Sequence, residues 1–156
     1  MSVKPIPEGY HSVTPYLSIK GATQAIEFYK RAFNAVEAFR LSTPSGEIAH
    51  AEIVIGNSQI MMSDACEDSP IPSPQVLGGS SVGMHLYVED VDVIFAQAVN
   101  AGASEVKPVE DQFYGDRMGT LKDPFGHIWF LSTHTEDLDL DEIQKRAEAL
   151  FKAENA

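Results

Sequence analysis

The sequence predicts an α+β fold made of two tandem βαβββ modules followed by one more helix. The first observation is a hairpin pattern that occurs twice, over 48–63 and over 118–132. Each copy has two short apolar runs around a turn, and the second turn, at 123–126, contains the proline and glycine that favour chain reversal. The second observation is an amphipathic helical pattern ahead of each hairpin. The two halves of the chain therefore share one plan.

The first module is expected to occupy 11–65, after an irregular lead-in at 1–10 that contains two prolines. Alternating apolar and polar residues predict its first strand, and apolar residues spaced three and four apart predict its helix. The remaining strands follow as short runs of high β-propensity. In order, the expected elements are a strand at 11–19, a helix at 22–33, and strands at 36–41, 48–55 and 58–63.

The second module is expected at 82–134, behind a linker at 66–81 that contains three prolines and a glycine pair. Asp90 or Asp92 can cap its helix, which runs to Asn100, and Gly102 stops it. Its strands are expected at 82–88, 105–109, 118–122 and 128–132.

The last segment, 135–156, is predicted to be a helix. Asp139 and Glu142 have the spacing of a capping box. An apolar stripe follows, and such a stripe must be buried, either on the helix's own domain or on a partner chain. The stripe consists of Ile143, Ala147, Leu150 and Phe151.

Composition and charge exclude several classes of function. The chain has 156 residues, 44% of them apolar, and its 23 acidic and 11 basic residues give a formal net charge of -12. Nucleic acids and anionic membranes both require a clustered basic surface, so neither is an expected partner. A single cysteine, Cys66, no secretory signal in the lead-in, and no apolar run long enough to span a bilayer together predict a cytoplasmic protein.

The two modules resemble the vicinal oxygen chelate superfamily, which includes glyoxalase I, bleomycin-resistance proteins and extradiol dioxygenases. The segments IAHAEIVIGNSQIMMSDA and FYGDRMGTLKDPFGHIWFL resemble its PhnB-like branch, and the resemblance covers 11–133. It implies that the modules curl into one mixed sheet, a cup with the helices outside. It also implies a homodimer, because the family commonly builds its cups by pairing or swapping modules.

In metal-dependent members, four strand positions supply His and Glu ligands to a divalent ion. The resemblance places these positions at Thr14, Met61, Gly83 and Phe130 of this chain. None of the four has the imidazole, carboxylate or thiolate that such an ion requires. We therefore expect neither a metal ion nor another cofactor.

Three other side chains are candidate catalytic residues. Strand alternation places His50 and Glu52 on the cup side, and His85 lies two residues beyond Gly83 on the same strand face. Such a set could hold a displaced metal ion or act as an acid–base pair. The alternative is that these are polar residues hydrogen-bonded to one another in a half-solvated sheet.

Seven side chains are candidate ligand-binding residues. At the mouth of the second hairpin, Arg117 could receive an anionic group, or it could only pair with Asp116 to close a turn. Alternation favours Asp116 inside the cup and Arg117 on the opposite face. The candidates are Tyr16, Met61, Tyr87, Tyr114, Asp116, Arg117 and Phe130.

These observations predict a glyoxalase-like or bleomycin-resistance-like protein that binds a small molecule in its cup without the usual four metal ligands. The alternative is a lyase or isomerase that uses His50, Glu52 and His85. A third possibility is an interaction module whose cup is filled by its own side chains.

Overall fold

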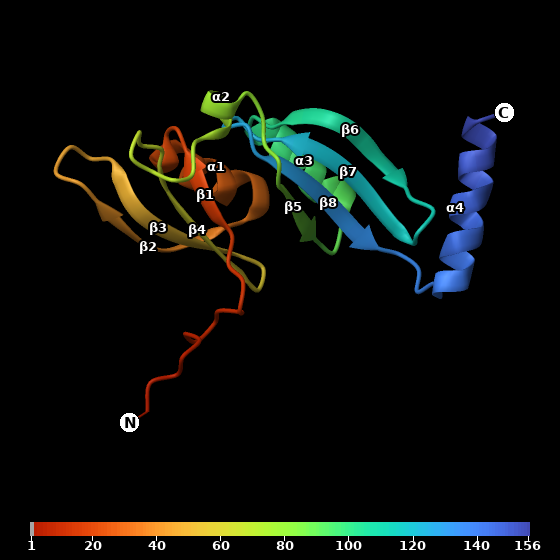
Figure 1. The fold of residues 1–156 in the computed structure, drawn as a ribbon, viewed down its shortest axis with the longest axis horizontal. Coiled ribbons are helices and arrows are strands. Elements are labelled where there is room, and N and C mark those ends of the chain that lie inside the picture. Colours follow the sequence, from red (N-terminus) through yellow and green to blue (C-terminus); the bar gives the residue numbers. More distant parts are fainter. Residues whose placement is uncertain (1) are drawn as a thin grey trace.

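Two four-stranded mixed sheets form the frame of the protein in the computed structural model, which describes residues 2–156 (Figure 1). The strand orders are β1-β4-β3-β2 and β5-β8-β7-β6. In each sheet the first strand is parallel to the last strand of its module, and the other pairs are antiparallel. The strands are β1 (Tyr16–Ile19), β2 (Val36–Ser42), β3 (Ile48–Ile55), β4 (Ser58–Asp64), β5 (Gly83–Tyr87), β6 (Ser104–Asp111), β7 (Asp116–Lys122) and β8 (Ile128–His134).

One long helix in each module covers the inner face of its sheet, which confirms the predicted tandem βαβββ plan. These helices are α1 (Ala22–Phe33) and α3 (Val91–Ala101), and they pack against each other. Asp90 caps α3 by accepting a hydrogen bond from the Val93 amide, and Gly102 follows its last turn, as predicted. The positions of both helices follow from the apolar spacing in the sequence.

The modules share one hydrophobic core. The Trp129 ring on β8 lies 4.6 Å from the Phe33 ring and 5.4 Å from the Tyr29 ring, both on α1 (centroid distances). The Tyr29 hydroxyl donates a 2.6 Å hydrogen bond to buried Asp123 in the β7–β8 turn. Burial first, and the Asp123 charge second, raise the pKa of Tyr29 well above its ordinary value. A first-module helix is thus fastened to a second-module turn.

The predicted single curled sheet is not formed, because within residues 2–156 no strand of the first sheet pairs with one of the second. The strand expected at 11–19 begins only at Tyr16, after Pro15, which has no amide proton to donate. The connecting loop at 65–82 then runs past β1 and β5 (Figure 1). Its side chains line the space between these two strands, as described below.

The connecting loop contains a short helix that we did not predict, α2 (Pro74–Leu77). Ser73 precedes it and Pro74 is its first residue, a sequence typical of a helix start. A side chain at Gly126 would lie 2.7 Å from Pro74, so α2 also sits against the β7–β8 turn.

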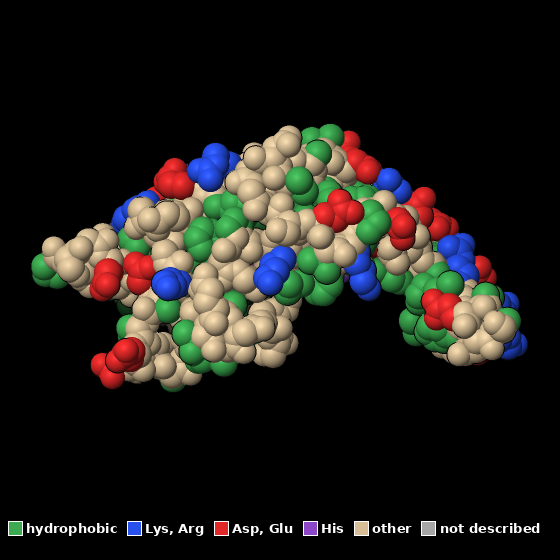
Figure 2. Space-filling view, turned by 90° about the horizontal axis from the view of Figure 1, so that it is seen from above, with side chains coloured by type: hydrophobic (Ala, Val, Ile, Leu, Met, Phe, Trp, Pro, Cys, Tyr) green, Lys and Arg blue, Asp and Glu red, His purple; other side chains and the backbone are tan. Residues whose placement is uncertain are grey.

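The C-terminal helix α4 (Leu140–Glu154) extends beyond the second sheet and buries none of its residues (Figures 1 and 2). Asp139 caps it by accepting from the Glu142 amide, as the capping-box spacing predicts. The domain covers the apolar stripe only in part, since Leu150 and Phe151 remain exposed. Across residues 2–156, no helix has the length and apolarity needed to cross a membrane.

Candidate functional site

A buried carboxylate organises the open face of the second sheet, the face turned away from α3. Asp116 is only 4% exposed, and it accepts a 2.7 Å hydrogen bond from the Tyr87 hydroxyl. Its other oxygen lies 2.8 Å from Nδ1 of His134, which must be the donor when Asp116 is ionised. Hydrogen bonding to Asp116 raises the pKa of Tyr87. Asp116, followed by Asp137, raises the pKa of His134.

Aromatic rings continue this face along β5 and β8. The His85 ring stacks on Tyr87 with centroids 4.7 Å apart and an interplanar angle of 17°, and its Nε2 lies 2.8 Å from the Ser132 hydroxyl. The Phe130 ring lies 6.0 Å from that of His85. A Cβ at position 83 would lie 2.4 Å from the Phe130 ring, so a larger residue there would displace this ring. An aromatic surface therefore covers positions 83 and 130, which the resemblance predicts to be the third and fourth chelating positions.

A hydrogen-bonded chain occupies the open face of the first sheet. The Tyr16 hydroxyl lies 3.0 Å from Nδ1 of His50, and Nε2 of His50 lies 3.0 Å from Glu52. Because an ionised Glu52 can only accept, the proton of a neutral His50 is on Nε2. Nδ1 is then the acceptor and Tyr16 is the donor. The chain can pass a proton from Tyr16 to His50, with Glu52 orienting the imidazole.

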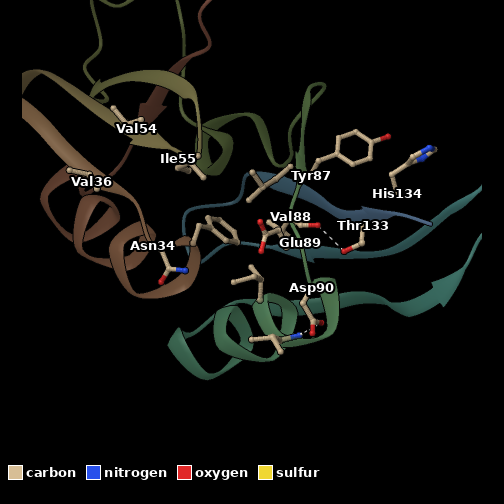
Figure 3. A pocket seen from close by; sticks show the side chains of 15 residues that line it. Asn34, Val36, Val54, Ile55, Tyr87, Val88, Glu89, Asp90, Thr133 and His134 are labelled. Carbon is tan, nitrogen blue, oxygen red and sulfur yellow. Dashed lines mark hydrogen bonds between the residues drawn. The ribbon is translucent and has the colours of Figure 1, made fainter. Parts of the chain in front are cut away.

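A groove of about 1220 Å³ lies between the two modules next to Tyr87 and His134 (Figure 3). In the close view the Tyr87 ring extends toward His134 on one side of the groove. Aliphatic side chains from both modules form about half of its wall, with the carboxylates of Glu89 and Asp90 beside them. The aliphatic residues are Val36, Val54, Ile55, Leu86, Val88, Val93 and Ile94.

The remaining predicted residues lie elsewhere. Arg117 lies on the α3 side of the sheet, as alternation predicts, and makes bonds of 2.8 and 2.9 Å to Asp92 and one of 3.3 Å to Asp111. Tyr114 donates to the Met118 sulfur at 3.5 Å, and burial raises its pKa. Met61 lies beside Tyr16 on the first sheet, while Thr14 precedes β1.

The three candidate catalytic residues do not form one cluster. His50 and Glu52 are bonded to each other, but within residues 2–156 no hydrogen bond joins either to His85. In the same part of the chain, no three His, Cys, Asp or Glu side chains are grouped so that they could hold a metal ion. The side chains at the chelating positions offer a divalent cation no strong ligand. The donor set does not fit the metal of the family.

His134 is the site residue that the sequence analysis missed. The last strand was expected to end at Ser132, but β8 continues to His134, which pairs with Asp116 across the sheet. A histidine just after a predicted strand, with an acidic residue on the neighbouring strand, could indicate such a pair. The inference requires the correct strand register.

Comparisons with known proteins agree with this fold. Residues 11–131 match the sequence profile of a family described as "Glyoxalase/Bleomycin resistance protein/Dioxygenase superfamily". The chain belongs to this superfamily. The uncharacterised protein Mb0911c of Mycobacterium bovis is 42% identical to it over 137 residues, which is 85% of this chain and 90% of that protein.

Solved structures match the fold as well. The crystal structure of the Arabidopsis thaliana At5g48480 protein has a TM-score of 0.65 and 26% identity, over 79% of this chain and 98% of that one. A PhnB protein from Bacillus cereus, described as a putative 3-demethylubiquinone-9 3-methyltransferase, has a TM-score of 0.63 and 16% identity, over 79% and 99% of the two chains. The profile match confirms the predicted superfamily, and a PhnB protein is among the structural neighbours of this chain.

Proposed function

We propose that this protein binds a small planar or apolar molecule against the second module, without a metal ion. The observation that carries the proposal is the exposed aromatic surface beside the groove. Tyr87 is 57% exposed, yet its hydroxyl is fixed by buried Asp116 and its ring is stacked on His85. A rigid aromatic ring beside an apolar groove loses little conformational entropy when a planar ligand stacks on it.

Charge narrows the class of ligand. Glu89 and Asp90 line the groove, and no Lys or Arg is among its lining residues. The chain also has a formal net charge of -12. A neutral or cationic ligand is therefore favoured over an anionic one. Function varies widely within this fold, so the proposal rests on these residues and not on the fold.

A fluorescence titration with proflavine, a planar aromatic cation, tests this proposal. We expect saturable binding to the wild-type chain and an affinity about ten-fold lower for Tyr87→Ala, which removes the stacking surface. Phe39→Ala is the matched control, because Phe39 is an exposed aromatic residue on the first sheet. It should bind proflavine like the wild type.

The counterpart probe is an anionic naphthalene sulfonate of similar size, which should bind more weakly than proflavine. Equal affinity of wild type and Tyr87→Ala for proflavine would contradict the proposed site. Tighter binding of the sulfonate would contradict the proposed charge of the ligand.

A second candidate function is a lyase or isomerase that uses acid–base chemistry. The observation that favours it is the chain from Tyr16 through His50 to Glu52, in which a carboxylate orients an imidazole that accepts from a phenol. Here the reacting group is the Tyr16 hydroxyl, and His50 is its base. Within residues 2–156 no hydrogen bond joins His85 to Tyr16, His50 or Glu52, so a catalytic role of His85 is a separate proposal.

The hemithioacetal of methylglyoxal and glutathione is a suitable first substrate, since glyoxalase belongs to the superfamily. If the first sheet is catalytic, His50→Ala should abolish isomerisation while the circular dichroism spectrum is unchanged. Thr120→Val is the control, a buried polar residue on the other sheet. His85→Ala tests the earlier three-residue hypothesis, which requires the same loss. Equal turnover in wild type and His50→Ala would remove this function.

We also propose that α4 covers a second copy of the chain in a homodimer. Leu150 and Phe151 are uncovered, and the space-filling view shows apolar atoms of α4 facing a hollow beside the second module (Figure 2). Light scattering should give a dimer for the wild type and a monomer for the double variant Leu150→Asp, Phe151→Asp. A monomeric wild type would contradict the proposal. We also propose that the protein is located in the cytoplasm. The exposed free Cys66 fits that reducing environment.

A further inference from the structure

A second, smaller cavity lies at the junction of the two modules. Its volume is about 310 Å³, and it lies between β1, the connecting loop and the start of β5. The loop passes the ends of both sheets at this point (Figure 1). The lining comes from Pro15, Tyr16, Leu17, Ser18, Ile71, Pro72, Pro74, Leu77, Gly79, Ser80, Ser81, Val82, Met84 and His127.

Three buried polar atoms without a hydrogen-bond partner belong to residues that line this cavity or adjoin its lining. The Ser18 hydroxyl and the Nε2 atom of His127 both belong to lining residues, which are only 3% and 8% exposed. The Ser73 hydroxyl, on a residue 1% exposed, lies between the lining residues Pro72 and Pro74. Residues 2–156 contain four such side-chain atoms, and the fourth belongs to Gln59. Three of the four therefore belong to this region.

Such atoms are costly in a folded protein. Burial of a hydroxyl or an imidazole nitrogen without a partner costs roughly 1–3 kcal/mol each. Native proteins pair more than about nine in ten of their buried polar groups, so a cluster of exceptions requires an explanation. A ligand that supplies the partners is one such explanation, and the cavity has the size at which small-molecule sites begin, roughly 300 Å³.

The lining also defines what could bind. No Asp, Glu, Lys or Arg contributes to it, so a charged ligand would be desolvated without a counter-charge. Half of the lining residues are aliphatic or proline. A hydroxyl and an imidazole can each donate or accept a hydrogen bond. We propose that this cavity is a second binding site, for a small neutral molecule of about one ring that has a hydroxyl or carbonyl group.

This site is distinct from the groove beside Tyr87, and it shares only Tyr16 with the second candidate function. Its lining includes none of His85, Tyr87 and Phe130, and it is formed largely by a loop that does not take part in the groove. Failure of proflavine to bind the groove would not contradict the proposal of this second site.

Three probes of similar size and different polarity test the proposal on the full chain. Phenol is neutral and can form hydrogen bonds, toluene is apolar, and benzoate is charged. In histidine-labelled protein, phenol should shift the nitrogen resonances of His127 in a saturable manner. Benzoate should leave them unchanged, and toluene should bind more weakly than phenol.

Variants separate a built site from an incidental void. Ser18→Ala should lower the affinity for phenol roughly five-fold, the equivalent of one net hydrogen bond, and leave that for toluene unchanged. Its unfolding midpoint should not fall, since the hydroxyl has no partner to lose. His127→Phe keeps a ring in place and should also lower the affinity for phenol. Thr120→Val is the control, and its affinity for phenol should be unchanged.

Several outcomes would overturn the inference. One is the absence of any His127 shift with millimolar phenol, which would mean that the cavity holds water only. Another is equal affinity for phenol and toluene in the wild type and in Ser18→Ala. Binding of benzoate as tightly as phenol would overturn the assignment of a neutral ligand.

Discussion

The two modules have the same backbone plan, and both have a side-chain hydrogen-bond acceptor at the N-terminus of the module helix. Near the end of the last strand of each module, one side chain accepts a hydrogen bond from the first amide of the module helix: Asp64 in the first module and Thr133 in the second. The distances are 2.8 Å to Ala22 and 2.9 Å to Val91. A helix N-terminus leaves amides without partners, so both modules retain an acceptor there.

On their open faces the modules differ. Counted back from the helices, Tyr16 and His85 occupy equivalent positions, opposite Met61 and Phe130 respectively. The first module uses this face for the chain from Tyr16 to Glu52, and the second for an aromatic surface held by Asp116. Structural requirements have kept the modules alike, while each open face has its own chemistry. One module therefore cannot stand in for the other in a binding site.

The hairpin turns provide the largest test of this comparison. Asp123 in the second module accepts from the Tyr29 hydroxyl, the Trp129 indole and two turn amides. Asp123→Ala leaves these buried donors without an acceptor and should lower the free energy of unfolding by about 3–5 kcal/mol. Urea unfolding followed by Trp129 fluorescence measures this change.

Asn57→Ala is the matched variant in the turn of the first module. Asn57 is exposed, and from residues 2–156 its side chain receives a single hydrogen bond, of 3.3 Å from Ser58. The loss should stay within about 0.5 kcal/mol. If Asp123→Ala cost no more than Asn57→Ala, the fastening of α1 to the second module would not contribute to stability.

The two helix caps should differ by a smaller amount. Asp64 accepts from the amides of Gly21, Ala22 and Ile48, whereas Thr133 accepts from one amide and donates to the Val88 carbonyl. We expect Asp64→Ala to cost about 2 kcal/mol and Thr133→Ala about 1 kcal/mol of unfolding free energy. Thermal and urea unfolding of both variants would check this order. Equal losses would mean that the additional Asp64 contacts add nothing.

Much of the fold could be predicted because its signals are local. The helix expected at 22–33 has those bounds in the structure, since the apolar spacing and the residues around it agree. The short α2 was missed because a proline-rich segment was interpreted as a linker throughout. The prediction of one curled sheet was wrong for a different reason. Pairing between β1 and β5 depends on what surrounds their edges, and a loop remote from β1 in sequence lines a cavity beside both strands.

The site was harder to predict because it depends on register. Alternation correctly placed Asp116 and Arg117 on opposite faces, since that inference needs only the period of a strand. It could not show that Asp116 and His134 lie opposite each other, because that requires the length of β8. His50, Glu52 and His85 share the open side of their sheets, but sharing a side does not bring side chains into contact.

The smallest expected effect concerns the protonation of His134. Asp116 raises its pKa above the ordinary value of about 6.5, and Asp137 contributes less. A raised pKa means that the folded state holds the proton more tightly than the unfolded state. The stabilisation is therefore fully present below about pH 6.5 and is lost as the pH rises through the pKa of the folded protein.

Asp116→Asn removes the main cause, so the pKa of His134 should fall toward its ordinary value in an NMR titration of the imidazole protons. Asp137→Asn should produce a smaller fall, in the order of the two causes. Glu52→Gln, on the open face of the first module, should leave the titration of His134 unchanged. A shift in that variant would show that the two open faces are electrostatically coupled, and the chemical independence of the modules would have to be abandoned.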